Sequence, residues 1–248
     1  MYTFEHEQTE QTPALIDYRY IGNSPNNYVR FNGNETWRII GVFYVDTEDS
    51  KEQKIKIVKD VKLSNNMDWN STNNNDWKNA TLNKYLNGNY YDSLNYTAKQ
   101  LISSSKFFLG EGDIRGNAEE YYLFERGINV HSGRSTNWSG MIALMYPSDY
   151  VYTYALGVDE TCYSNGANCA NGSPISGWIY NSNSNSDIHL LSANSSNDQV
   201  YDIGAAGFIG KNNNASVSRG VRPTLYLKSN VKIKSGDGSI DSPYEFEL

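Results

Sequence analysis

The stretch from Tyr201 to Leu227 reads Y-D-I-G-A-A-G-F-I-G-K-N-N-N-A-S-V-S-R-G-V-R-P-T-L-Y-L, and we expect it to close the fold. Strand-forming residues at both of its ends, separated by the polar run Asn212–Asn214, predict a hairpin. Because Pro223 has no backbone N–H, it is expected at a strand start, an edge or a bulge. Arg219 and Arg222 are expected to hold the returning loop through hydrogen bonds to carbonyl oxygens.

Composition favours one folded domain. The chain has 248 residues, enough to bury a sizeable core, and its 5 Trp and 20 Tyr argue against disorder. The net charge is −7, with no basic cluster, so nucleic acid is not an expected partner. No apolar run is long enough to span a membrane. We expect residues 1–17 to be a leader or truncated tether and residues 18–248 to form a single domain.

A second hairpin is the clearest local prediction. Tyr28–Phe31 runs into Asn32-Gly33, a pair that allows positive φ at both turn positions, and Thr36–Phe43 runs back. The alternating residues Lys54–Lys59 predict a third strand of the same sheet.

The remaining elements are shorter. Asp76 is positioned to cap a helix that contains Trp77, Leu82, Tyr85 and Leu86 and ends at Gly88. A second helix is expected near Thr97–Ile102. Short strands are expected at Lys106–Leu109, at residues 141–146 before Pro147, at His189–Ser192, and in a final hairpin of Val231–Lys234 and Tyr244–Leu248. Residues 110–200 are otherwise mostly irregular, which is uncommon in a compact domain unless the loops are functional. The fold class is therefore α+β, with a twisted antiparallel sheet, two short helices and a large loop region.

Cys162 and Cys169 are separated by six residues. This spacing suits neither a zinc site nor a thioredoxin-like pair, and a local disulfide fits best. A disulfide would place the protein in an oxidising compartment outside the cytosol, while a pair of free thiols is the alternative.

The sequence predicts no enzyme, no cofactor and no metal site. The chain has no G-x-S-x-G motif, and its three histidines are scattered. Asp237-Gly-Ser-Ile-Asp241 offers carboxylates but lacks the third acid and the distal Glu of a calcium loop. Calcium binding at these two residues is the open alternative.

Loop aromatics beside Asn or Asp give the binding hypothesis. They occur at Asp68-Trp69-Asn70, Asp76-Trp77, Asn137-Trp138 and Trp178–Asn181. A flat ring with nearby amide groups suits a neutral polar ligand, although each Trp could instead fill the core beneath its loop. The predicted ligand-binding residues are Trp138, Trp178, Tyr180 and Asn181.

Several long motifs resemble those of an uncharacterised domain family of gut-dwelling Gram-positive bacteria. They are Y-I-G-N-S-P-N-N-Y-V-R-F-N-G with W-R-I-I-G-V-F, W-K-N-A-T-L-N-K-Y-L-N-G-N-Y-Y, L-M-Y-P-S-D-Y, and G-V-R-P-T-L-Y-L-K-S-N-V-K-I with G-D-G-S-I-D-S-P-Y. The resemblance extends over nearly the whole chain from Tyr18. It implies a surface or secreted protein, in some members behind a prepilin-like or membrane-anchoring segment.

The order of elements in His189–Leu227 also resembles the end of C-type-lectin-like bacterial domains. This resemblance implies a C-type-lectin-like fold. The calcium-dependent sugar motifs of animal lectins, E-P-N and Q-P-D, are absent, so that mechanism and its residues do not transfer.

We therefore expect an extracellular binding or adhesion module of a surface or pilin-like protein, anchored by a missing N-terminal segment. Its expected partner is a glycan, or a host or bacterial surface protein, with no membrane insertion by this segment. The alternatives are a structural, self-assembling surface domain and an envelope-acting or thiol-dependent enzyme.

Overall fold

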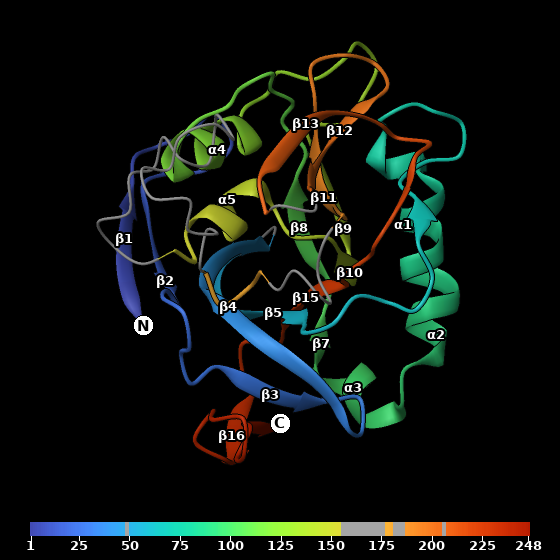
Figure 1. The fold of residues 1–248 in the computed structure, drawn as a ribbon. Coiled ribbons are helices and arrows are strands. Elements are labelled where there is room, and N and C mark those ends of the chain that lie inside the picture. Colours follow the sequence, from blue (N-terminus) through green and yellow to red (C-terminus); the bar gives the residue numbers. More distant parts are fainter. Residues whose placement is uncertain (48–49, 155–176, 181–186, 205–206) are drawn as a thin grey trace, which may run out of the picture.

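The computed structural model describes residues 1–47, 50–154, 177–180, 187–204 and 207–248 (Figure 1). These residues form a mixed, strand-rich structure with a few short helices, as the expected α+β class requires.

A large antiparallel sheet forms the centre of the molecule. Its strand order is β1-β2-β4-β5-β15-β10, with β3 paired to β4 and β7 paired to β15. The strands are β1 (Tyr2–His6), β2 (Leu15–Arg19), β3 (Tyr28–Phe31), β4 (Glu35–Thr47), β5 (Ser50–Lys59), β7 (Ile102–Ser103), β10 (Ile142–Ala143) and β15 (Thr224–Leu227). Strands from both ends of the chain thus share one sheet, as expected.

Smaller sheets surround this centre. One contains β11 (Ile188–Ala193), β12 (Gln199–Ile203) and β13 (Ile209–Asn214). Three two-stranded sheets pair β6 (Met67–Asp68) with β14 (Ser218–Arg219), β8 (Ser105–Phe108) with β9 (Asn137–Gly140), and β16 (Lys232–Ser235) with β17 (Glu245–Glu247). The pairing of β16 with β17 confirms the predicted C-terminal hairpin.

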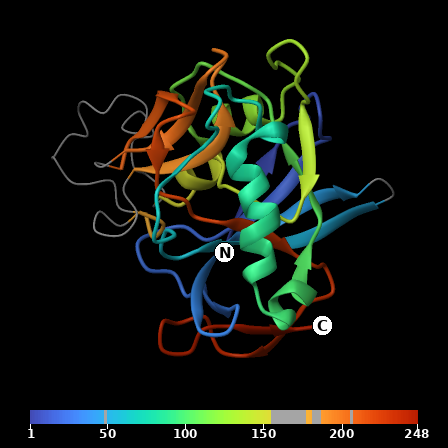
Figure 2. The ribbon, with the colours of Figure 1, turned by 90° about the vertical axis from the view of Figure 1, so that its right-hand side faces the viewer.

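The described helices are short. They are η1 (Trp77–Asn79), α1 (Thr81–Tyr85), η2 (Leu86–Tyr90), α2 (Tyr91–Ser93), α3 (Tyr96–Leu101), α4 (Ala118–Glu125) and α5 (Pro147–Val151). Figure 2 shows the helical column formed by α1, η2 and α2 beside the strands. No helix within the described ranges is long and apolar enough to cross a membrane.

The hairpin predicted around Asn32-Gly33 is confirmed. Both residues have positive φ, 50° and 83°. Phe31 pairs with Glu35, so the loop has three residues rather than two. The strand predicted at Lys54–Lys59 is also confirmed, because β5 pairs with β4 along its length.

The hairpin predicted for Tyr201–Leu227 is wrong. Asn212–Asn214 lie in β13, which pairs with β12, whereas β15 pairs with β5, β7 and β10. The four residues of β15 are all buried, so this strand belongs at the centre of the large sheet rather than on a loop hairpin. Pro223 immediately precedes β15, as expected.

The single helix predicted from Asp76 to Gly88 is divided into η1, α1 and η2. Asp76 makes no side-chain cap, and Gly88 lies inside η2 instead of ending the helix. The Asn87 side chain donates to the Ile142 carbonyl and accepts the Met141 N–H, and these bonds hold the helical chain as it passes Gly88.

The predicted tether, residues 1–17, contains β1 and the first residues of β2, and both strands belong to the large sheet. β1 pairs with β2 along its whole length, and His6 is only 4% exposed. The β2 backbone approaches β4 so closely that a Cβ on Gly41 would lie 2.2 Å from the Tyr18 oxygen. Only glycine fits there without moving a strand.

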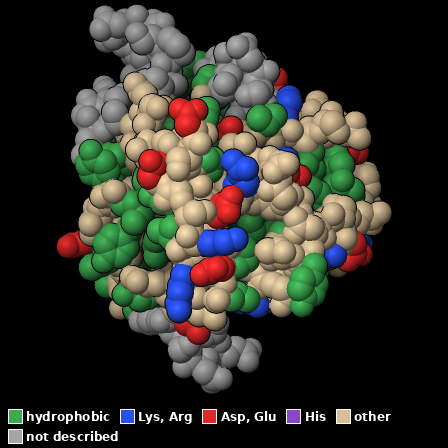
Figure 3. Space-filling view, turned by 90° about the horizontal axis from the view of Figure 1, so that it is seen from below, with side chains coloured by type: hydrophobic (Ala, Val, Ile, Leu, Met, Phe, Trp, Pro, Cys, Tyr) green, Lys and Arg blue, Asp and Glu red, His purple; other side chains and the backbone are tan. Residues whose placement is uncertain are grey.

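The surface around the C-terminal hairpin has no dominant charge. In the view from below, positive and negative side chains alternate across this face (Figure 3). Lys232 is the register partner of Glu247 in the β16–β17 pairing, and Arg30 Nε forms an ion pair with Glu245 Oε1 at 3.8 Å.

Candidate functional site

Residues of the loop between β5 and η1 line two hollows. The middle of this loop is anchored where β6 pairs with β14, with Asp68 opposite Ser218. The Asn70 side chain donates to the Asn74 carbonyl, and Asn73 adopts a positive φ of 51°. Asparagine tolerates this conformation and bonds its own backbone, so the Asn-rich sequence forms a defined loop.

The larger hollow, here called the polar groove, has a volume of about 360 Å³. It is lined by Asn66, Met67, Asp68, Ser71, Thr81, Leu82, Tyr85 and Ser218. Most of these side chains are uncharged and polar, with the Tyr85 ring half-buried. The volume is within the range of small-ligand sites.

Contacts within the groove fix several of its walls. Ser218 Oγ donates to Asp68 Oδ1, and the Ser71 N–H donates to Thr81 Oγ1 at 3.0 Å. These bonds join the loop to β14 on one side and to α1 on the other. The groove is therefore a preformed surface built from three separate segments.

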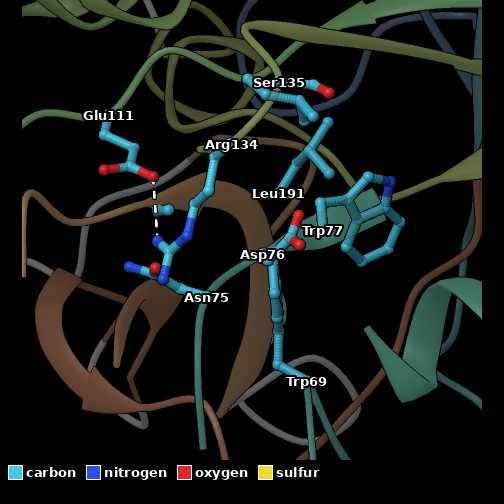
Figure 4. A pocket seen from close by; sticks show the side chains of 10 residues that line it. Trp69, Asn75, Asp76, Trp77, Glu111, Arg134, Ser135 and Leu191 are labelled. Carbon is cyan, nitrogen blue, oxygen red and sulfur yellow. Dashed lines mark hydrogen bonds and ion pairs between the residues drawn. The ribbon is translucent and has the colours of Figure 1, made fainter. Parts of the chain in front are cut away.

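The smaller hollow, here called the inner pocket, has a volume of only about 10 Å³ (Figure 4). It is lined by Trp69, Asn75, Asp76, Trp77, Leu109, Glu111, Arg134, Ser135, Leu191 and Ala193. That volume suits about one ordered water or one polar group of a larger ligand.

An ion pair closes one side of the inner pocket. Arg134 Nη1 donates to Glu111 Oε1 at 3.0 Å, as the dashed line in Figure 4 marks, and the His131 N–H donates to Oε2 at 2.8 Å. Burial raises the pKa of Glu111, although these two donors act in the opposite direction. Both carboxylate oxygens are engaged, so Glu111 joins the loop that carries it to the segment around His131 and Arg134.

Asn75 joins the same loop to the β11–β12 turn. Its amide nitrogen donates to the carbonyls of Asn194, Ser196 and Gln199 at 2.7–3.0 Å. Its Oδ1 has no hydrogen-bond partner among the described residues, so it is an acceptor at the pocket wall.

The tryptophans beside acids are core residues. Trp69 and Trp77 are 0% and 2% exposed, and the Trp69 indole donates to the Leu190 carbonyl at 3.0 Å. Both rings nevertheless form part of the inner pocket's wall, together with Asp76, while Asp68 lines the groove. The aromatic–acid pattern therefore lies in the loop that lines both hollows, and its tryptophan rings are buried in the core.

The predicted ligand-binding residues do not form one site among the described residues. Trp138 in β9 packs edge-on against Trp77, with ring centroids 6.1 Å apart, and does not itself line the inner pocket. Trp178 is 7% exposed, and its indole donates to the Tyr20 carbonyl at 2.8 Å. Tyr180 is half-buried and its ring covers Gly207.

Three other predicted residues lie outside the described residues: Asn181, Cys162 and Cys169. The Asp237 carboxylate accepts the Ser239 N–H at 2.9 Å within its turn. Within the described part of the chain, no three His, Cys, Asp or Glu side chains are grouped as metal ligands would be.

The two arginines before β15 have different roles. Arg222 donates to the carbonyls of Lys59 and Ile179, as expected. Arg219 instead binds the carboxylates of Asp187 and Asp202. Burial raises the pKa of Asp202 to about 6.

Sequence reasoning missed Glu111, Arg134, Ser135 and Asn75 as pocket residues. Glu111 lies in a glycine-rich turn 23 positions before Arg134, and no sequence motif links the two residues. Only the tertiary structure brings them together.

Comparisons with known proteins give one partial match. Residues 52–128 match a family model described as a domain of unknown function (DUF6273). This segment runs from β5 to just beyond α4 and supplies every groove residue except Ser218. No curated protein and no solved structure matches the chain.

Proposed function

We propose that this protein is a binding module that recognises a neutral polar polymer, best represented by a glycan, in the polar groove. The observation that carries the proposal is the groove's lining, in which amide and hydroxyl groups surround the half-buried ring of Tyr85. An aromatic face with flanking hydrogen-bonding groups matches a sugar ring with its hydroxyls.

The number of carboxylates in the groove favours binding over catalysis. Asp68 is the sole carboxylate among the described residues that line the groove, and it accepts a hydrogen bond from Ser218. Acid–base hydrolysis of a glycosidic bond ordinarily uses two carboxylates across the substrate. We therefore propose that the protein is not an enzyme.

The proposal extends to the fold and the location. The shared sheet of N- and C-terminal strands, with the smaller β11–β13 sheet beside irregular loops, supports a C-type-lectin-like architecture. A surface or extracellular location, a pilin-like or otherwise anchored context and a disulfide between Cys162 and Cys169 belong to the same proposal. They are supported by the sequence motifs and the cysteine spacing.

The test is binding of the purified protein to a panel of host and bacterial glycans, with calcium and again with a chelator. For a glycan that binds, Tyr85→Ala and Asp68→Asn should each weaken affinity by about 3- to 10-fold, as expected for one lost contact. Tyr96→Ala is the matched control, because Tyr96 is 77% exposed on α3 and does not line the groove.

Wild-type affinity in both groove variants would show that the site lies elsewhere. A panel without any binding would contradict the glycan proposal. Light scattering would then test the alternative of self-assembly, and pull-down with surface proteins would test a protein partner.

A further inference from the structure

A lysine and an aspartate from distant elements meet in the interior. Lys56 is on β5 and Asp149 is on α5, 93 residues later in the chain. Both side chains are 1% exposed, and Lys56 Nζ contacts Asp149 Oδ2. The Nζ atom lies 4.3, 5.3 and 5.6 Å from the ring centroids of Tyr146, Tyr226 and Phe43. Water is thus excluded from the pair.

We propose that Lys56 and Asp149 join covalently in an intramolecular amide bond. The bond forms between Lys56 Nζ and Asp149 Cγ, and one C–O bond of the Asp149 carboxyl breaks. The ammonium–carboxylate pair contains every atom required: Nζ gives up two hydrogens and Cγ loses one oxygen, which leave together as water. The reaction is not a redox reaction and needs no external reactant.

The surroundings favour the nucleophilic form of the lysine. Burial lowers the pKa of Lys56, Asp149 opposes this effect, and the positive charges of Arg19 and Arg126 lower the pKa further. A desolvated lysine next to other cations is a recognised activated nucleophile. The fixed contact between the two groups replaces a bimolecular encounter.

The carboxyl group is held for attack. Asp149 Oδ1 accepts from Arg19 Nη1 at 3.3 Å, and Oδ2 accepts the Tyr146 N–H at 3.0 Å. Two donors on these oxygens stabilise the negative charge that develops when an amine adds to the carbon. Glu125 holds the preceding residue, since it accepts both the N–H and the hydroxyl of Ser148.

Intact-mass spectrometry of the full chain tests the bond after complete thiol reduction, so that a disulfide does not alter the mass. The wild-type protein should be lighter than its sequence mass by one water. Lys56→Met and Asp149→Ala should have their full calculated masses. The matched control is Lys54→Met, which should keep the loss, because Lys54 is also buried but donates to Ser103.

Proteolysis should release a branched peptide that joins the segments around Lys56 and Asp149. A wild-type chain at its full calculated mass would overturn the proposal, even if the variants fail to fold. A water loss that fragmentation maps to another residue would also overturn it. The glycan experiments involve other residues, so either proposal can fail alone.

Discussion

Among single residues, Glu125 is a buried acid whose ionisation lowers the stability of the folded protein. Its side chain is 0% exposed, and burial raises its pKa to about 7 despite nearby Arg126 and two hydrogen bonds from Ser148. The folded protein therefore binds this proton more tightly than the unfolded chain does. The resulting stability is complete below the unfolded pKa near 4.5 and is lost as the pH rises through about 7.

Glu125→Gln should remove this pH dependence, because glutamine resembles the protonated acid. Between pH 5 and pH 8, the free energy of unfolding of the variant should rise relative to wild type by roughly 2–3 kcal/mol. Urea unfolding at the two pH values measures the difference. A constant difference across this range would show that Glu125 is already ionised in the fold at pH 5.

The comparison must be made between the two proteins, because other buried groups titrate in the same window. Asp202, with a pKa near 6, acts in the same direction as Glu125. His189 acts in the opposite direction, since burial lowers its pKa to about 4 and its stability contribution is lost as the pH falls below 6.5. Both contributions cancel in the difference.

At the level of helices and strands, the sequence predicted local features such as turns well, but it did not predict which strands pair with each other. Asn32-Gly33 specified its hairpin because positive φ is a property of those two residues. β15 was assigned to the wrong partner because the sequence Thr224–Leu227 shows that a strand is buried without showing which strand lies beside it. α4 was missed, although Asn117 and Glu120 form a capping box at its start.

The helix expected near Thr97–Ile102 is present as α3, and Asn95 caps it. Asn95 Oδ1 accepts the Ala98 N–H at 2.8 Å. Asn95→Ala should lower the free energy of unfolding by about 1 kcal/mol, because the helix loses the acceptor for one of its free N–H groups. Denaturant midpoints measure the loss, and Asn95→Asp is the control that retains the acceptor. Equal losses in both variants would assign the effect to something other than capping.

At the level of the whole molecule, the sequence did not predict the candidate site for the same reason that it did not predict the strands beside β15. Both depend on contacts between segments that are far apart in the chain. The Asn-rich composition identified the loop, but the groove also needs Thr81 and Tyr85 from α1 and Ser218 from β14. Ser218 reaches Asp68 across 150 residues of sequence. Contacts at such separations depend on the topology of the sheets, which a single sequence does not display.

The N-terminal segment gives the sharpest test of the overall architecture. His6 Nε2 lies 3.1 Å from Asp17 and Nδ1 lies 2.7 Å from Glu119, while its ring stacks on Tyr122 at 3.6 Å. The segment thus joins the sheet edge to α4. Deleting residues 1–12 would remove β1 and leave the buried Asp17 without its histidine partner.

Asp17 keeps its ion pair with Arg19, but the deletion removes the pairing of β1 with β2 and the buried contacts of His6. We therefore expect it to lower the free energy of unfolding by about 3 kcal/mol or more. Thermal and urea unfolding of the two chains measure the loss. Glu7→Ala, at an exposed position of the same segment, should behave as wild type. A deletion variant as stable as the full chain would mean that residues 1–12 are a tether after all, and that the sheet is complete without β1.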